Sequence, residues 1–88
     1  MDLSDDELKA DVMYKLMRRC CWGGKYIPAD SLVRWLSKRV KKNGKRVRNI
    51  IEQLINEGLL ISHKKGKTIS LNPARSGEIR EFIRKYIG

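Results

Sequence analysis

The sequence is poor in the side chains that cross-link a chain or bind metal ions. Its 88 residues include two cysteines and one histidine. The cysteines, Cys20 and Cys21, are neighbours, and a disulfide between neighbours would close a strained small ring. Four zinc ligands cannot be assembled from so few Cys and His residues. We therefore expect reduced thiols, no metal site and a place in the cytoplasm.

Long apolar segments are missing as well. No apolar run approaches the roughly 18 residues that indicate a membrane-spanning helix. No stretch combines a basic start, an apolar middle and a small-residue cleavage site, as a secretory signal would. A chain of this length closes one modest core. The sequence thus predicts a single domain over residues 1–88 that has no membrane partner.

Sets of catalytic residues are not recognisable either. A nucleophile needs a base within hydrogen-bond reach, and general acid–base chemistry needs paired titratable groups. One histidine and ten carboxylate residues, most of them in surface patterns, supply no such set, and the chain has no glycine loop that would cradle phosphates. We expect a binding protein without a cofactor, not an enzyme.

Positive charge is what the sequence has in excess. Twenty Lys and Arg residues against ten Asp and Glu residues give a net charge of +10. Such a field favours polyanionic partners, of which nucleic acid is the commonest. The distribution is uneven, because residues 1–11 carry five acids whereas residues 31–51 carry eight bases and no acid. This asymmetry indicates that one segment makes the nucleic-acid contact.

The first half of the chain predicts two helices and a short strand. Ser4 and Glu7 fit a capping box at the start of a helix over residues 4–20. The core face of that helix contains Val12, Met13, Leu16 and Cys20. A glycine pair ends it, a short strand follows at residues 25–27, and Pro28 is suited to open a second helix that reaches residue 40.

The second half predicts a helix, a hairpin and a last helix. After a turn at residues 41–44, a helix over residues 45–57 places Val47, Ile50, Ile51 and Leu54 inward. Strands at residues 59–63 and 68–71 flank a lysine-rich turn. Pro73 breaks the second strand, and a helix follows over residues 76–87. The apolar stripe of this last helix consists of Ile79, Phe82, Ile83, Tyr86 and Ile87.

This order of elements resembles the winged helix-turn-helix family. The resemblance covers residues 4–71, and the segment from Gly44 to Leu60 looks like the family's recognition helix running into its wing. It implies an α+β fold, mainly α, with a three-helix core, a β-hairpin wing at residues 59–71 and an additional C-terminal helix. The Lys- and Ile-rich composition resembles that of small archaeal regulators.

The resemblance also implies a function. Members of the family insert the third helix into the major groove of duplex DNA, and many regulate transcription. Winged-helix regulators commonly form dimers through terminal helices, so we expect a homodimer through the C-terminal helix. Packing of that helix on the first helix of its own chain is the alternative. Winged helices also serve RNA binding and protein–protein contact, so a ribosome-associated protein or a protein-interaction module stays open as a function.

The predicted site residues fall into two groups. Arg, Lys, Asn and Gln on the outer face of the third helix are types that read base edges in the major groove. These candidates are Lys45, Arg46, Arg48, Asn49 and Gln53. Cations on the second helix, the turn and the hairpin suit phosphate contacts. These candidates are Arg34, Lys38, Lys41, Lys42, Lys64, Lys65 and Lys67. The alternatives are an ordinary solvated helix face and a lysine-rich turn that discourages edge aggregation.

The aromatic side chains have two interpretations. Trp22 and Trp35 could stack on bases, as aromatic residues do in single-strand binders. Packing in the core or at its rim is the interpretation that we favour for both. His63 is expected to be a residue of the strand and not a ligand.

Overall fold

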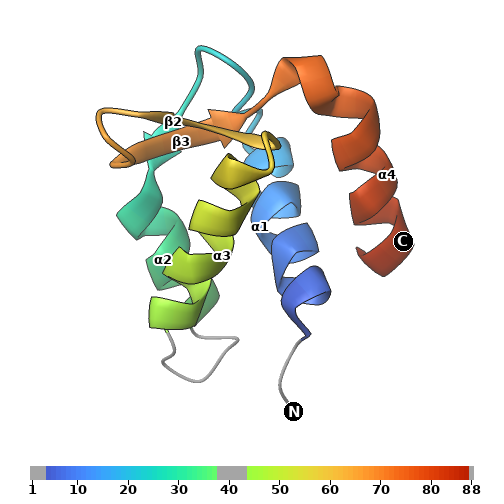
Figure 1. Ribbon diagram of the computed structural model, residues 1–88, viewed down its shortest axis with the longest axis horizontal. Coiled ribbons are helices and arrows are strands. Elements are labelled where there is room, and N and C mark those ends of the chain that lie inside the picture. Colours follow the sequence, from blue (N-terminus) through green and yellow to red (C-terminus); the bar gives the residue numbers. More distant parts are fainter. Residues whose placement is uncertain (1–3, 38–43, 88) are drawn as a thin grey trace.

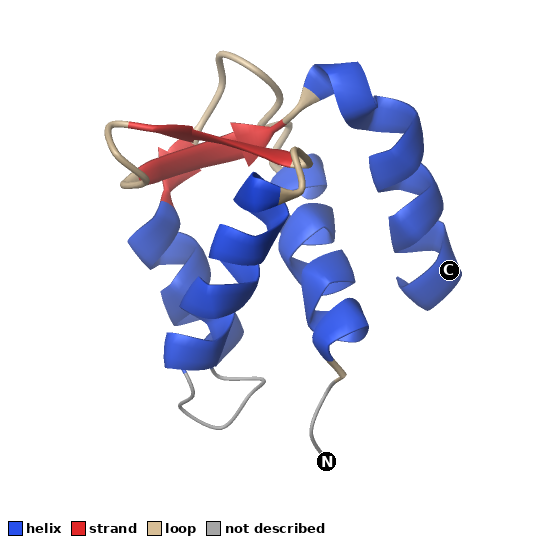
Figure 2. Ribbon diagram, viewed as in Figure 1, coloured by secondary structure: helices blue, strands red, loops and turns tan. Residues whose placement is uncertain are grey.

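The computed structural model describes residues 4–37 and 44–87, which form helices and a small sheet (Figures 1 and 2). The elements in chain order are α1 (Asp5–Arg18), β1 (Ile27–Pro28), α2 (Ala29–Ser37), α3 (Gly44–Asn56), β2 (Leu60–His63), β3 (Thr68–Leu71), the 3-10 turn η1 (Pro73–Arg75) and α4 (Ser76–Ile87). The predicted α+β class with mainly helical content is confirmed in these segments.

Helix α1 begins with the predicted capping box. The Ser4 hydroxyl accepts from the Glu7 N–H at 3.1 Å, and the Glu7 carboxylate accepts from the Ser4 N–H at 3.2 Å. The helix ends at Arg18 because Cys20 adopts a φ of 56°, which lies outside the helical region. The expectation that Cys20 faces the core was therefore wrong. Cys20 is exposed and Cys21 is buried instead.

The sheet contains three antiparallel strands in the order β1-β3-β2. In the hairpin, Leu60 pairs with Leu71 and His63 pairs with Thr68. Pro28 belongs to β1, where it pairs with Thr68 of β3. It does not open α2, which begins at Ala29. The prediction for Pro28 was wrong because a proline, which lacks an N–H, is also tolerated on an edge strand such as β1.

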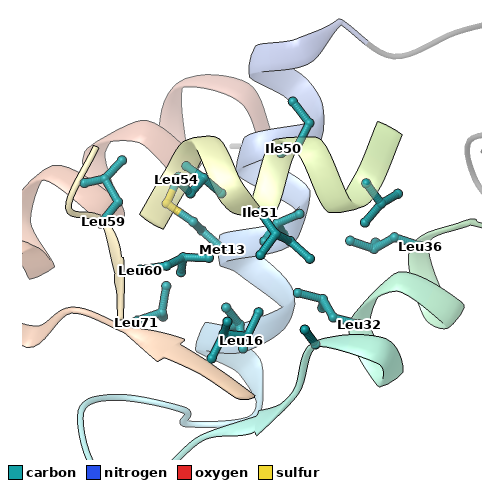
Figure 3. Packing of buried hydrophobic residues seen from close by; sticks show 14 of the residues in the cluster. Met13, Leu16, Leu32, Leu36, Ile50, Ile51, Leu54, Leu59, Leu60 and Leu71 are labelled. Carbon is teal, nitrogen blue, oxygen red and sulfur yellow. The ribbon is translucent and has the colours of Figure 1, made fainter. Parts of the chain in front are cut away.

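The core lies where α1, α2 and α3 meet the sheet (Figure 3). The predicted inward stripe of α3 is confirmed, since Val47, Ile50, Ile51 and Leu54 are all buried. Residues from the other elements complete this core, and those shown in Figure 3 include Met13, Leu16, Leu32, Leu36, Leu59, Leu60 and Leu71. Burial of the stripe determines which face of α3 remains outside.

Helix α4 packs against α1 of the same chain (Figure 1). Ile79 and Ile83 are 0% and 5% exposed within the common core. The Tyr86 hydroxyl donates to the Asp6 carboxylate at 3.1 Å, and this hydrogen bond raises the pKa of Tyr86. The inner part of the predicted stripe thus belongs to this chain's own core. Ile87 at the end of the helix is 40% exposed, and the homodimer stays a prediction.

Truncation of Ile83 tests this packing. We expect Ile83→Ala to lower the free energy of unfolding by about 2–5 kcal/mol, because the change leaves a cavity in a packed core. Ile87→Ala on the same helix should change it by less than about 0.5 kcal/mol, as exposed positions generally do. Urea unfolding followed by circular dichroism measures both values. Equal effects of the two variants would contradict the packing of α4 described above.

Candidate nucleic-acid interface

The outer face of α3 carries the predicted base-reading residues. Because the apolar stripe points inward, Lys45, Arg48, Asn49 and Gln53 are exposed, whereas Arg46 is partly buried. The structure therefore places these five side chains on the accessible part of one helix. All five are polar donors or acceptors of the kinds that bind base edges and phosphates.

A shallow hollow of about 370 Å³ runs along one side of α3, next to the start of α1. Its polar lining includes Asn49 and Gln53, which bring two amide groups together one helical turn apart. Arg46 lies at the same hollow and donates to the Asp5 carboxylate at 3.0 Å. This side of α3 thus combines uncharged hydrogen-bonding groups with a cation that is held in position.

A second hollow, of about 460 Å³, lies between α3 and the β2–β3 hairpin. Arg48 and Asn56 line it from α3, and Lys65 and Gly66 line it from the turn of the hairpin. Arg48 and Lys65, which lie 17 positions apart in the sequence, therefore face one groove. A ligand in that groove would contact the helix and the hairpin at the same time.

The turn of the hairpin has an unusual backbone. Lys64, Lys65 and Gly66 follow one another with φ angles of 51°, 58° and 86°. This left-handed region favours Gly and Asn, so lysine is a costly choice at the first two positions. Lys64, Lys65 and Lys67 are exposed, and none of them forms an ion pair within residues 4–37 and 44–87. We call this segment, residues 64–67, the basic turn.

Two carboxylates that the sequence analysis did not assign to the site pair with its arginines. Asp30, at the start of α2, accepts a hydrogen bond from Arg48, and Asp5 pairs with Arg46. The Arg48 and Asp30 side chains are 59% and 80% exposed, so their attraction is screened by water. Such surface pairs contribute about 0–1 kcal/mol. Both arginines therefore have a carboxylate partner in the free protein and can exchange it for an anionic ligand.

The remaining predicted phosphate contacts are only partly described. Arg34 is exposed on α2. Lys38, Lys41 and Lys42 lie outside the described residues. The structure thus gives positions for the predicted site residues of α3, for those of the basic turn and for Arg34 of α2.

His63 occupies a structural position beside the basic turn. Its ring stacks on Tyr26, with centroids 4.3 Å apart. The Ser70 hydroxyl donates to the Gly23 carbonyl at 2.8 Å, so at the 3.4 Å contact between His63 Nε2 and Ser70 Oγ the histidine nitrogen is the donor. These contacts join the hairpin to the loop before β1.

The other residues considered as sites pack against the core. Trp22 and Trp35 are partly buried against it, which confirms the interpretation favoured for both. Burial raises the pKa of the Cys21 thiol, which therefore stays protonated near neutral pH. Among the described residues, no cluster of three or more His, Cys, Asp or Glu side chains is arranged to hold a metal ion. The helices of this part of the chain are too short and polar to cross a bilayer.

Comparisons of the chain with protein-family models, with curated proteins and with solved structures found no match. A functional assignment for this protein therefore depends on the two hollows beside α3 and on the charges around them.

Proposed function

We propose that this chain is a winged helix-turn-helix protein that binds duplex DNA in a sequence-specific manner and regulates transcription. In this proposal α3 enters the major groove, and the basic turn contacts phosphates as the tip of the wing. The observation that carries the proposal is the groove shared by Arg48 of α3 and Lys65 of the basic turn. A convex duplex can meet a helix and a hairpin together only if both line the same side of the protein.

The arrangement of elements supports this assignment. A short edge strand precedes α2, the third helix leads directly into the hairpin, and the strand order is β1-β3-β2. The chain order of these elements is the one that the winged-helix resemblance implies. The 13 residues of α3 form a rod about 20 Å long, and its diameter of about 10–12 Å matches the width of the major groove.

The outer face of α3 has the chemistry for reading bases. The amide of Asn49 or Gln53 can donate to and accept from one adenine, and Arg48 can form two hydrogen bonds to guanine. Glu52 is exposed on the same face and can accept from the amino group of cytosine. It would also repel phosphates. A mixture of amides, cations and one acid on the helix favours base contacts over backbone contacts there.

The basic turn has a different composition. Its three lysines have no described ion-pair partner, and two of them, Lys64 and Lys65, occupy left-handed positions that suit Asn better. Ammonium groups at such a place are well suited to neutralise phosphates, which supplies affinity without sequence preference. We assign the basic turn to the DNA backbone for this reason.

Removal of the charges from the basic turn tests the proposal. We expect Lys64→Asn, Lys65→Asn and Lys67→Gln, combined, to weaken binding equally on all duplexes. Asn tolerates the left-handed backbone, so the turn should persist in this variant. The plot of log affinity against log salt should become shallower by about 0.9 for each lost phosphate contact. Fluorescence anisotropy of labelled duplexes over a series of KCl concentrations measures both effects.

The same titrations distinguish DNA binding from the two alternative functions, RNA binding and protein–protein interaction. The deep, narrow major groove of duplex RNA does not admit a helix, so matched duplex RNA should bind more weakly than DNA. Stronger binding of structured RNA at matched salt would favour the RNA-binding alternative. If no duplex binds even at low salt, a protein-interaction module becomes the better assignment.

Asn49 provides a test of base reading. Once a preferred sequence has been selected from a random pool, Asn49→Ala should remove the preference at one base pair, at a cost of about 1–3 kcal/mol. The salt slope should stay unchanged because no charge is lost. Arg48→Ala, in contrast, should weaken binding and flatten the slope if Arg48 contacts phosphate. A selected motif that Asn49→Ala recognises as well as the wild type does would show that this face of α3 is not in the groove.

The pair between Arg48 and Asp30 generates a further prediction. We expect Asp30→Asn to raise affinity for DNA by up to about fivefold. In the wild type, Arg48 must break its ion pair with Asp30 before it binds DNA, and in the variant this cost is absent. Glu78→Gln is the matched control, since Glu78 is also an exposed acid in the first turn of a helix and pairs with Arg75. Equal increases in the two variants would mean that only the net charge matters.

A further inference from the structure

Three cations gather at the end of α1, away from the interface proposed above. Lys15, Arg18 and Arg19 line a hollow of about 300 Å³. Within the part of the chain that the structure describes, no carboxylate forms an ion pair with any of them. The acids near the start of the same helix have other partners, such as Arg46 for Asp5.

Arg19 lies over an aromatic ring at this hollow. Its guanidinium carbon lies 3.9 Å from the centroid of the Trp35 ring on α2, and Lys15 Nζ lies 5.8 Å from the same centroid. Stacking on an aromatic face occupies the plane of a guanidinium and leaves the N–H groups on its edge available. Those groups match two oxygens of one phosphate. The tryptophan thus prepares the arginine for an anion.

The charges around the hollow indicate what kind of anion fits. Three like charges around one small hollow repel one another, and a bound anion would relieve that repulsion. One strand of a duplex carries a phosphate about every 3.4 Å of axis, which is close to the spacing of side chains along an extended acidic polypeptide. The choice between the two therefore rests on the net charge of +10, for which nucleic acid is the commonest polyanionic partner. The cluster therefore favours a phosphodiester backbone.

This cluster lies on a different side of the protein from the α3 interface. Helices α1, α2 and α3 pack pairwise against one another (Figure 1), so the outside of the seam between α1 and α2 points away from the exposed face of α3. The residues lining the hollow at the end of α1 are shared with neither hollow beside α3. One duplex lying along α3 would leave the cluster uncovered.

We propose that Lys15, Arg18 and Arg19 form a second nucleic-acid site, which binds the phosphate backbone of another duplex segment. One molecule of the protein would then bridge two segments of DNA. This goes beyond the proposed function, which needs only one duplex. Because the cluster contains no base-reading amide, the second contact is independent of sequence.

A capture experiment tests the bridge. Duplex immobilised on beads is saturated with the protein and washed, and a fluorescent duplex is then added. The wild-type protein should retain the fluorescent duplex. Arg18→Gln combined with Arg19→Gln should retain at least about tenfold less, because two phosphate contacts are lost. Arg18→Lys with Arg19→Lys, which keeps the charge, should restore part of the capture.

The matched control is Arg80→Gln combined with Lys85→Gln. It removes the same charge from exposed positions of α4, and Arg80 likewise lies over a tryptophan ring, 5.4 Å from the centroid of Trp22. This control should bridge as the wild type does. All variants should bind a single dilute duplex within about threefold of the wild-type affinity after the lost net charge is taken into account. Circular dichroism verifies that each variant is folded.

The outcomes separate this inference from the proposed function. If the first duplex binds and no second duplex is captured, the inference is wrong and the proposed function stands. If Arg18→Gln combined with Arg19→Gln captures as much of the second duplex as the wild type does, a dimer forms the bridge and the second site is wrong. If that variant loses the first duplex while the basic-turn variant keeps it, the cluster is the main site and α3 is not. Displacement of the second duplex by polyglutamate at matched charge would identify an acidic protein as the occupant.

Discussion

Burial of the apolar stripe of α3 is the interaction on which the candidate interface depends. Val47, Ile50, Ile51 and Leu54 pack into the core shared by α1, α2 and the sheet. Each such side chain is stabilised by about 1.5–3 kcal/mol when it leaves water. A rotation of α3 about its axis would expose part of the stripe, so the core holds the helix in one orientation. The polar residues between the stripe positions have no alternative to the outer face.

The charges of the candidate interface divide into two kinds. Arg46 and Arg48 are paired with carboxylates from α1 and α2, whereas the lysines of the basic turn have no described ion-pair partner. Each of these arginines must give up its carboxylate before it binds a phosphate or a base, which costs up to about 1 kcal/mol. Unpaired lysines produce a field that extends into solvent and speeds encounter with a polyanion. In our proposal the basic turn attracts DNA and α3 recognises its sequence.

Helix α4 contributes only part of its apolar stripe to the core. Its inner residues, Ile79 and Ile83, complete the core of the chain. Its outer side, with Phe82 and the charged residues Glu78, Glu81 and Lys85, lines a hollow of about 520 Å³ together with Leu59. The stripe seen in the sequence is therefore wider than the surface that α1 covers. The homodimer that the sequence predicts through the C-terminal helix stays a prediction.

The sequence by itself determined the features that depend on near neighbours. The capping box of Ser4 and Glu7, the inward stripe of α3 and the turn at residues 64–67 all arise from residues within a few positions of one another. Helical periodicity and turn chemistry act over that range, so they are readable without a fold. The outer face of α3, and with it the predicted Asn49, followed from the same periodicity.

Only the tertiary structure decided which distant residues meet. Arg46 pairs with Asp5, which is 41 positions away in the sequence, and Arg48 pairs with Asp30, which is 18 positions away. The stacking of Arg19 on Trp35 likewise requires α1 and α2 to lie side by side. Periodicity places a side chain on a face of its own helix but contains no information on which helix lies opposite. That choice is made by the packing of the whole core, where many small contacts are satisfied together.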